Sequence, residues 1–401
     1  MTAEPTVRQS PPPPRRRVRE LGLRIGSLPP GPTNTIADVA DVTVGHRTVW
    51  RDEADPPAGR GTARTGITVI VPLGDRLPHE RVPAGAAVLN GAGEAIGITS
   101  IAEWATLETP IFLTSSMAIG RVYDGAVATL AEAAPDGSFD DAIMPVVAEC
   151  DDGDLNRPVP VQVDEADVRA ALDDARNATG RAVPLGVVGA GTGMRAFEVK
   201  GGIGSASRIV RPIHRRSTTP APDAPAFTLG VLVLANFGEL ERLVVDGVPV
   251  GAALAAEGWP EAGGGRRRRR ARTNEGSCIV VVATDAPLFG HALDRLARRA
   301  GLGLARTGTT AHHGSGEIFL AFSTGIRFPR ADGPAVRTTA HVDDEHLDPF
   351  FAAVVEATEE ATLDAIFTAD TVTGQAGRTV PGLPIEATLA ILRAAGRDVS
   401  A

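Results

Sequence analysis

Several stretches of the chain carry the continuous apolar pattern of strands that are buried on both faces. Each is short, rich in β-branched residues and bounded by turn residues. They are Thr65–Pro72, Phe227–Asn236, Cys278–Ala283 and Glu317–Ser323. Weaker segments predict strands at 84–90 and 143–149, and a strand, a Pro-Gly turn and a second strand between residues 21 and 49. The pattern therefore predicts a core rich in β-sheet.

Apolar residues at helical spacing predict helices between and after these strands. From residue 116 to residue 134, one stripe contains Val122, Ala126, Leu130 and Ala133. Similar patterns predict helices at 164–178, 287–300, 349–370 and 384–396. Because strands and helices follow no regular βαβ rhythm, a layered α/β sandwich is favoured over a doubly wound sheet or a barrel.

Composition and charge argue against several classes of partner. The 401 residues are 43% apolar but only 4% aromatic, and the net charge is −9, which disfavours a nucleic-acid-binding surface. No apolar run reaches the roughly 18 residues that span a bilayer, so no membrane partner is expected. The two cysteines, Cys150 and Cys278, have neither disulfide-scaffold nor metal-ligand spacing. We therefore predict no metal and no other cofactor.

Two polar segments border or interrupt the predicted domain. Residues 1–20 are rich in proline and arginine and lack the apolar segment of a signal peptide. We expect a disordered tail, a cytoplasmic location and a single domain over residues 21–396. Residues 257–272 include three consecutive glycines followed by five arginines. A nucleic-acid patch there would lack aromatic residues next to the arginines, so a solvated linker is favoured.

The pair Gly276-Ser277 stands at the start of one predicted core strand. Gly276 has no Cβ to block the approach of the Ser277 hydroxyl to its carbonyl carbon. An N-to-O acyl shift followed by hydrolysis would free Ser277 as a new N-terminus. Its α-amine, with a reference pKa of about 7.7–8.0, would then serve as a general base. The same dipeptide is also typical of an ordinary turn, so its neighbours must decide between the two interpretations.

Four further residues are candidates for the same site. Ser315 and Glu317 would project from one face of a strand, where they could bind the attacking serine and the freed ammonium group; a loop entering an edge strand gives the same pattern. Asn236 closes a predicted strand and offers an amide donor for an oxyanion, or it starts a turn. Glu149 ends another strand, where it meets either the amine of a substrate or solvent.

Two other motifs are interpreted as structural. The glycines of Val188–Met194 are misplaced for a dinucleotide-binding loop, so close approach of this backbone to a strand or to a peptide is favoured. His312 and His313 would point in opposite directions in an extended segment, and no further ligands accompany them. We expect loop histidines there and no metal site.

Long motifs follow one another along most of the chain, from about residue 21 to residue 396. They are GPTNTIADV (31–39), RTGITVIVP (64–72), LNGAGE (89–94), LETPI (107–111), VGAGTGM (188–194), KGGIGSASR (200–208), LVLANFG (232–238), NEGSCIVVVATDAPL (274–288) and GSGEIFLAFSTG (314–325). Together they resemble the β-peptidyl aminopeptidase and L-aminopeptidase/D-esterase family of self-processing serine hydrolases. The resemblance implies a four-layer α/β/β/α sandwich similar to that of N-terminal-nucleophile hydrolases.

The resemblance also implies roles for the candidate residues. Cleavage would fall between Gly276 and Ser277, giving an α chain (1–276) and a β chain (277–401) that assemble as a homo-oligomer, which we expect to be a tetramer. Ser277 corresponds to the nucleophile, and Asn236 to the oxyanion donor. The supporting hydroxyl and carboxylate correspond to Ser315 and Glu317. The group that binds the amino terminus of the substrate corresponds to Glu149. The implied activity is cofactor-free release of N-terminal amino acids from short peptides, amides or esters.

One position departs from the family pattern. Family members carry a tyrosine in the loop after the glutamate, but the only tyrosine of this chain is Tyr123. Asp151 stands in that loop, where its charge would disfavour an oxyanion and favour a cationic substrate, so Asp151 is a further candidate for substrate binding. Two alternatives remain: an acyltransferase of the ornithine acetyltransferase type, for which a threonine nucleophile is expected, and an uncut, non-catalytic binding protein.

Overall fold

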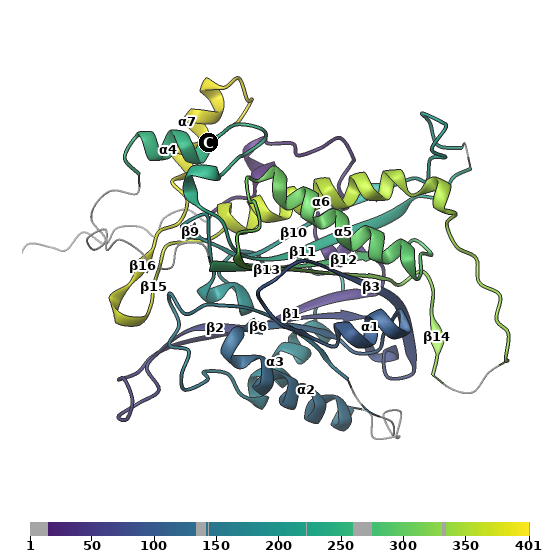
Figure 1. Ribbon diagram of the computed structural model, residues 1–401, viewed down its shortest axis with the longest axis horizontal. Helices are drawn as coiled ribbons and strands as arrows, with labels where there is room; N and C mark the ends of the chain where they lie inside the picture. Colours follow the sequence, from purple (N-terminus) through teal and green to yellow (C-terminus); the bar gives the residue numbers. More distant parts are fainter. Residues whose placement is uncertain are drawn as a thin grey trace, which may run out of the picture.

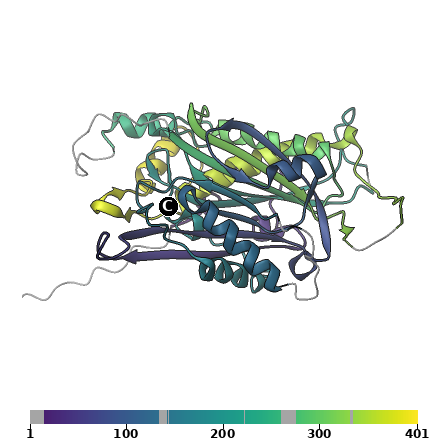
Figure 2. The ribbon, with the colours of Figure 1, turned by 60° about the horizontal axis from the view of Figure 1, so that its bottom comes forward.

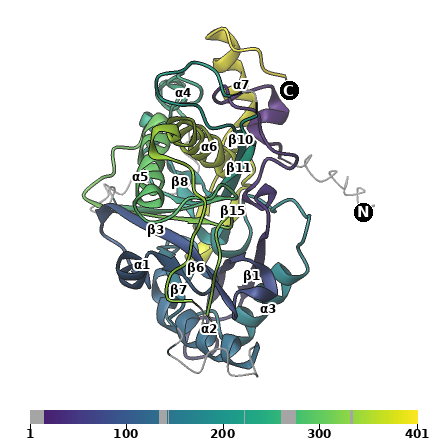
Figure 3. The ribbon, with the colours of Figure 1, turned by 90° about the vertical axis from the view of Figure 1, so that its right-hand side faces the viewer.

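The computed structural model of the protein describes residues 15–133, 142, 144–221, 223–259, 275–330 and 334–400. In this part of the chain two sheets face each other, and helices cover the outer face of each (Figure 1). The helices α5 (His291–Arg306) and α6 (Asp348–Phe367) lie on one sheet, and α2 (Ile119–Ala133) and α3 (Glu165–Arg176) lie on the other. A side view shows the same order of layers (Figure 3). The predicted α/β/β/α sandwich is confirmed.

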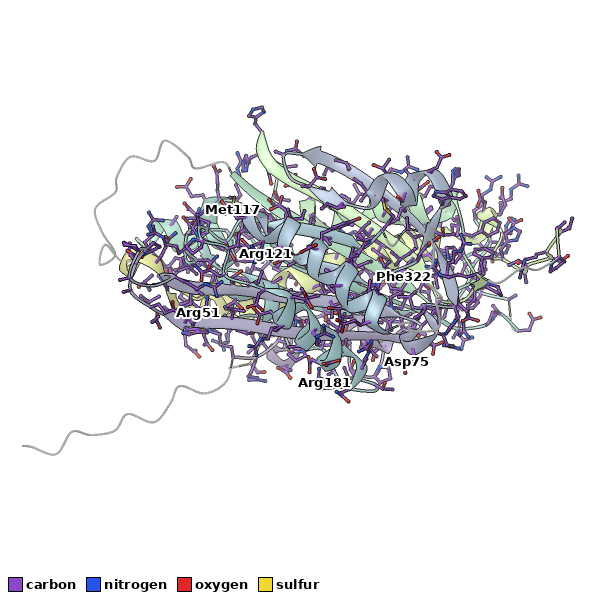
Figure 4. All side chains as sticks on the ribbon, turned by 90° about the horizontal axis from the view of Figure 1, so that it is seen from below. Arg51, Asp75, Met117, Arg121, Arg181 and Phe322 are labelled. Atoms are coloured by element: carbon purple, nitrogen blue, oxygen red, sulfur yellow. The ribbon has the colours of Figure 1, made fainter. Side chains whose placement is uncertain are left out.

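The smaller of the two facing sheets has the strand order β1-β2-β6-β7-β4. Its strands are β1 (Val42–Asp52), β2 (Thr62–Pro72), β4 (Ala95–Ile96), β6 (Ile111–Ser115) and β7 (Val146–Cys150). Only β6 and β7 are parallel, and α2 crosses the outer face of the sheet (Figure 2). From below, Arg121 lies on α2 and the half-exposed Met117 lies just before it (Figure 4).

The larger sheet has the order β10-β11-β12-β13-β3-β14, with β5 paired to β3. Its strands are β3 (Glu80–Gly91), β5 (Thr106–Leu107), β10 (Gly202–Val210), β11 (Phe227–Asn236), β12 (Glu275–Thr284), β13 (Gly314–Ser323) and β14 (Phe328–Pro329). The strands β12 and β13 are parallel, whereas β11 runs antiparallel to β12. The strand β12 therefore has a neighbour on each side from Ser277 to Thr284.

The remaining helices and strands are short and lie at the edges of the sandwich. They are the helices α1 (Ile98–Trp104), α4 (Val250–Ala256) and α7 (Ile385–Ala394), and the strand pairs β8 (Arg195–Ala196) with β9 (Val199–Lys200) and β15 (Val372–Thr373) with β16 (Thr379–Val380). Within the described ranges, no helix combines the length and the apolar content needed to cross a bilayer.

The central strand β12 separates two apolar layers. Its residues Cys278 and Val280 pack toward the helices α5 and α6, whereas Ile279 and Val281 pack between the two sheets. All four are at most 1% exposed, and complete burial of one such aliphatic side chain contributes about 1.5–3 kcal/mol. A strand with apolar layers on both faces favours an uninterrupted apolar sequence, which explains the pattern of this segment.

Helix α6 packs directly on β10 because a glycine faces it. A methyl group added at Gly204 would overlap the carbonyl oxygen of Ala361. The strand β10 is not among the predicted strands, because its sequence GIGSASRIV contains glycines and serines where a core strand usually has apolar residues. These small residues permit the close packing of the helix.

The predicted strand before the Pro-Gly turn is wrong. Residues 22–41 form no strand, and the first strand of the described chain begins at Val42. The reason lies in side-chain hydrogen bonds: the backbone N–H groups of Ser27 and Leu28 donate to the carboxylate of Glu356 on α6. Backbone donors that are satisfied in this way do not need a neighbouring strand.

The first of the two predicted polar segments differs in part from the structure, whereas the second is not tested. Val18–Leu21 forms a 3₁₀ turn, and Arg17 Nε donates to Asp364 Oδ2 at 2.7 Å, so the packed chain begins before the predicted boundary at residue 21. Residues 1–14 lie outside the described residues. Of the predicted linker, residues 257–259 follow α4, and residues 260–274 also lie outside the described part of the chain.

Candidate active site

Ser277 lies at the start of β12, between two strands that carry other candidate residues. It is opposite Asn236 on β11 and beside Gly316 on β13, and it is only 5% exposed. Neighbouring strands of a sheet are about 4.8 Å apart. The backbone register therefore brings the predicted nucleophile and the predicted oxyanion donor together at one position of the sheet.

The loop after β3 covers the position beside Ser277. A methyl group added at Gly316 would lie 2.9 Å from the carbonyl oxygen of Ala92 and 3.1 Å from the Cα of Gly93. A methyl group added at Gly93 would in turn lie 3.3 Å from Glu149 Oε1. Glu149, which belongs to the other sheet, is thus separated from the Ser277 position by little more than a glycine backbone.

Glu149 is a buried carboxylate whose hydrogen-bond donors are neutral. It is 6% exposed; Oε1 accepts from the backbone N–H of Glu94 at 3.0 Å, and Oε2 accepts from the Ser116 hydroxyl. Burial raises the pKa of Glu149, and the Ser116 hydrogen bond opposes that effect. A buried carboxylate without a cationic partner is stabilised by a bound ammonium group, which suits recognition of an amine.

The side chain of Asn236 has a defined orientation. Its Oδ1 accepts from the Arg195 N–H, and its Nδ2 donates to the carbonyl oxygen of Asp151, both at 2.9 Å. The amide nitrogen carries two hydrogens, so one N–H remains after the bond to Asp151. Since Asn236 is opposite Ser277, the amide can donate this hydrogen to an oxygen that forms near the serine.

Ser315 and Glu317 share a face of β13, as predicted, because the Ser315 hydroxyl donates to Glu317 Oε1. However, that face is not the face of Ser277. Ser277 alternates with Ile279 and Val281, which point between the sheets, whereas Glu317 alternates with Phe319, which points toward the helices. The structure thus brings this pair beside the backbone of the Gly276-Ser277 peptide and not beside the Ser277 side chain.

Glu317 keeps one carboxylate oxygen without a hydrogen-bond donor. The residue is 1% exposed, and Oε2 has no partner among the described residues. Burial raises its pKa, and the hydrogen bond from Ser315 and the nearby side-chain amide of Asn90 oppose that effect. Glu317 is the register partner of Cys278, the residue that follows Ser277. It is therefore a candidate acceptor for an ammonium group at the start of β12.

Asp151 occupies the predicted loop, but its carboxylate has a local role. Oδ1 accepts from the N–H of Gly153 at 2.9 Å, and the side chain is exposed. The backbone carbonyl of Asp151, rather than the carboxylate, bonds to Asn236. A nearby ion pair between Arg195 and Asp154, at 3.0 Å, was not predicted, because the two residues are distant in sequence.

The two motifs interpreted as structural can be located. A methyl group at Gly191 would lie 2.5 Å from the N of Ile203, so the glycine segment approaches a strand closely, as predicted. His312 accepts a hydrogen bond from Asn90 through its carbonyl oxygen at 2.7 Å. Within the described residues, no group of three or more His, Cys, Asp or Glu side chains is arranged to hold a metal ion.

Sequence reasoning missed Ser116 and Lys200. Ser116 donates to Glu149, and Lys200 is completely buried behind the glycine segment. The position of Ser116 directly after β6, which is parallel to β7, could have indicated its contact with the end of β7. A lysine between apolar and glycine residues was a weaker signal, because its partners are backbone carbonyls.

The sequence matches the model for peptidase family S58 over residues 34–380. A curated relative, the β-peptidyl aminopeptidase BapA of Sphingosinicella xenopeptidilytica, is 38% identical over 382 residues, which are 94% of this chain and 91% of the relative. The chain is thus similar to a characterised aminopeptidase over almost the whole length of both proteins.

Two solved structures are similar in fold and sequence. The PH0078 protein of Pyrococcus horikoshii OT3 has a TM-score of 0.84 and 38% identity, with 96% of this chain and 100% of that chain covered. The L-aminopeptidase D-Ala-esterase/amidase of Ochrobactrum anthropi has a TM-score of 0.83 and 36% identity, with 95% and 99% covered. The latter is described as a prototype of the serine aminopeptidases and a new variant of the Ntn hydrolase fold.

Proposed function

Because the chain belongs to peptidase family S58 and is an aminopeptidase of the N-terminal-nucleophile type, we propose that Ser277 is its nucleophile and is freed by self-cleavage. The observation that carries this proposal is the register of β12, which aligns Ser277 with Asn236 and with Gly316. Gly316 contacts the loop after β3, and that loop contacts Glu149. A nucleophile, an amide donor and an amine-binding carboxylate would then surround one position.

In the self-cleavage that we propose, Ser277 Oγ attacks the carbonyl carbon of Gly276. The peptide C–N bond breaks, the nitrogen takes the proton, and water hydrolyses the resulting ester to give a Gly276 carboxylate and a free Ser277. A glycine at this position is consistent with the packing, since a methyl group would lie 2.7 Å from the carbonyl oxygen of Asn236 and 2.9 Å from the Cα of Phe237.

In the proposed reaction with substrate, Glu149 binds the ammonium group of a short peptide, amide or ester. Ser277 attacks the acyl carbon with its α-amine as general base, and the remaining N–H of Asn236 binds the oxyanion. Water then hydrolyses the acyl-enzyme. The oxygen of Glu317 that lacks a donor supports the proposal, because it can accept a hydrogen bond from the new α-ammonium group when the amine is protonated.

Three further parts of the proposal concern the cellular location, the assembly of the cut chains and the substrate preference. We propose a cytoplasmic protein in which the cut chains, 1–276 and 277–401, remain together and assemble as a homotetramer. Asp151 is proposed to attract cationic substrates through its exposed carboxylate. The acyltransferase alternative is not favoured by the comparisons, since the chain matches a peptidase family.

The proposal is tested by intact mass and by hydrolysis of aminoacyl p-nitroanilides. The wild-type protein should separate into fragments 1–276 and 277–401, and Ser277→Ala should remain one inactive chain. Ser217→Ala, an exposed position, serves as the control and should be cut normally. If Ser277→Ala yields the same two fragments, another group makes the cut. If the wild-type chain stays whole and inactive, a binding protein becomes the better account.

A further inference from the structure

Lys200, the last residue of β9, is a completely buried cation bound by backbone oxygens. Its Nζ donates to the carbonyl oxygens of Gly191 at 3.0 Å, Met194 at 2.7 Å and Gly201 at 2.7 Å, so all three ammonium hydrogens are used. Burial lowers the pKa of Lys200 to about 7, and the charge of Asp152 opposes that effect. A buried charge with neutral partners is costly, so its position requires an explanation.

The peptide unit between Met194 and Arg195 joins this lysine to the candidate oxyanion donor. The C=O of the unit accepts from Lys200 Nζ, and the N–H of the same unit donates to Asn236 Oδ1 at 2.9 Å. A cation at the oxygen end of a peptide polarises it and strengthens the hydrogen bond from its nitrogen end. Because Oδ1 is held in this way, Asn236 Nδ2 must face Asp151 and the site.

We propose that Lys200 is a positioning residue for the reaction, acting through the Met194–Arg195 peptide to orient and polarise the Asn236 amide. The inference rests on the proposed function, since it takes Asn236 as the donor to the oxyanion. The oxyanion exists only after Ser277 attacks, so the effect of Lys200 is confined to the chemical step. In the proposed function, substrate affinity depends on Glu149. Within the described residues its hydrogen-bond donors are Glu94 and Ser116, and not Lys200, the Met194–Arg195 peptide or Asn236.

The first test is Lys200→Met, measured per cut protomer as counted by intact mass. We expect kcat to fall about 10- to 100-fold while KM stays within about two-fold, because removing an oxyanion donor outright costs about 10²–10³ in kcat. Leu254→Ala removes a buried side chain on α4 and is the control for destabilisation alone. It should lower stability and leave kcat unchanged. Equal kcat values in Lys200→Met and wild type would overturn the inference.

A double-mutant cycle separates this inference from the proposed function. Asn236→Ala should lower kcat, and Lys200→Met should cause no further loss in that background, because the lysine acts through the amide. If Asn236→Ala leaves kcat intact, the proposed oxyanion role fails. If Asn236→Ala lowers kcat but the two effects multiply, Lys200 acts elsewhere and the inference alone fails.

Lys200→Gln covers the case in which the methionine variant does not fold. Its neutral amide can still donate hydrogen bonds to the carbonyl oxygens but carries no charge. We expect a loss of kcat that is smaller than that of Asn236→Ala, again with KM unchanged. A folded Lys200→Gln variant with wild-type kcat, or one whose KM rises while kcat is kept, would contradict the inference.

Discussion

Buried charges occur in two regions of this molecule, and they are compensated in opposite ways. Along α6, carboxylates face guanidinium groups: Arg208 Nη2 lies 2.7 Å from Glu360 Oε2, and Arg19 Nη2 lies 2.7 Å from the same oxygen. At the candidate site, the hydrogen bonds that Glu149 and Lys200 make within the described residues are to neutral groups. Glu360 therefore has cationic hydrogen-bond partners, whereas Glu149 has none in the described part of the chain.

The pKa directions of Glu360 and Glu149 follow this difference. Burial raises the pKa of Glu360, but the Arg19 hydrogen bond and the charge of Arg208 outweigh it and leave the pKa below its usual value. Burial raises the pKa of Glu149, and its neutral partners do not reverse the shift. The cations of Arg19 and Arg208 thus compensate the burial of Glu360, and we call these two residues with Glu356 and Glu360 the α6 cluster. Glu149 has no such partner in the described residues, which is consistent with its proposed binding of a substrate ammonium group.

The largest effect is expected for Arg208→Met. It would leave Glu360 and Glu356 buried with one fewer cation, and breaking a buried ion pair in this way costs about 3–5 kcal/mol. Chemical unfolding of the uncut Ser277→Ala chain, with and without the second change, measures this difference. The kcat of folded, cut Arg208→Met should match that of wild type. A loss of stability below about 1 kcal/mol would mean that the buried cation of Arg208 does not compensate the α6 carboxylates as inferred.

A smaller effect is expected for Glu149→Gln, and it should appear in substrate binding. Loss of the ammonium partner should raise KM about 10- to 100-fold, equivalent to about 1.4–2.8 kcal/mol, with stability unchanged. The exposed Glu94 is the matched control: Glu94→Gln keeps the backbone N–H that binds Glu149 and should keep the wild-type KM.

The same residue predicts a dependence on pH. A raised pKa means that Glu149 takes up its proton at a higher pH than an ordinary glutamate, and the protonated form no longer attracts an ammonium group. In the wild-type enzyme, KM should therefore rise as pH falls, beginning above the usual glutamate range. In Glu149→Gln this acid-side rise should be absent. Identical KM profiles for the two proteins would assign the binding of the amine to another group.

The smallest effect is expected for Arg19→Met. Arg19 is partly exposed, and Glu360 would keep its bonds to Arg208 and Asn34. The loss of stability should be about 1 kcal/mol or less, as for a partly exposed ion pair. The comparison with Arg208→Met in the same uncut background is the informative measurement. If both variants lost the same stability, the α6 cluster would behave as one unit rather than as a buried pair with an outer partner.

The strands that sequence could predict are those with apolar layers on both faces. Phe227–Asn236 was predicted with the bounds that the structure has, because most positions of this strand are apolar. The strand β10 could not be predicted in this way. Its Ser205 hydroxyl donates to the carbonyl oxygen of Val231 and accepts from the N–H of Ile36. Hydrogen bonds to distant segments satisfy its polar residues, and a local pattern does not contain them.

The candidate site was predictable for the residues that stand near the ends of predicted strands. Ser277 and Asn236 stand at strand ends, and the resemblance to a known family placed them in one site, which the register is consistent with. The orientation of Ser315 and Glu317 was not predictable. A strand pattern shows that two residues share a face, but it does not show whether that face is turned toward the helices or toward the other sheet. Lys200 depends on three carbonyl groups from a folded segment, so only the tertiary structure identifies it.

The place of β12 between β11 and β13 has a consequence for the nucleophile. Chain ends usually fray, because nothing holds them on either side. A cut before Ser277 would create an end that is still bordered by a strand on its left and on its right. Such a terminus would combine the free amine of a loose end with the fixed position of an interior residue.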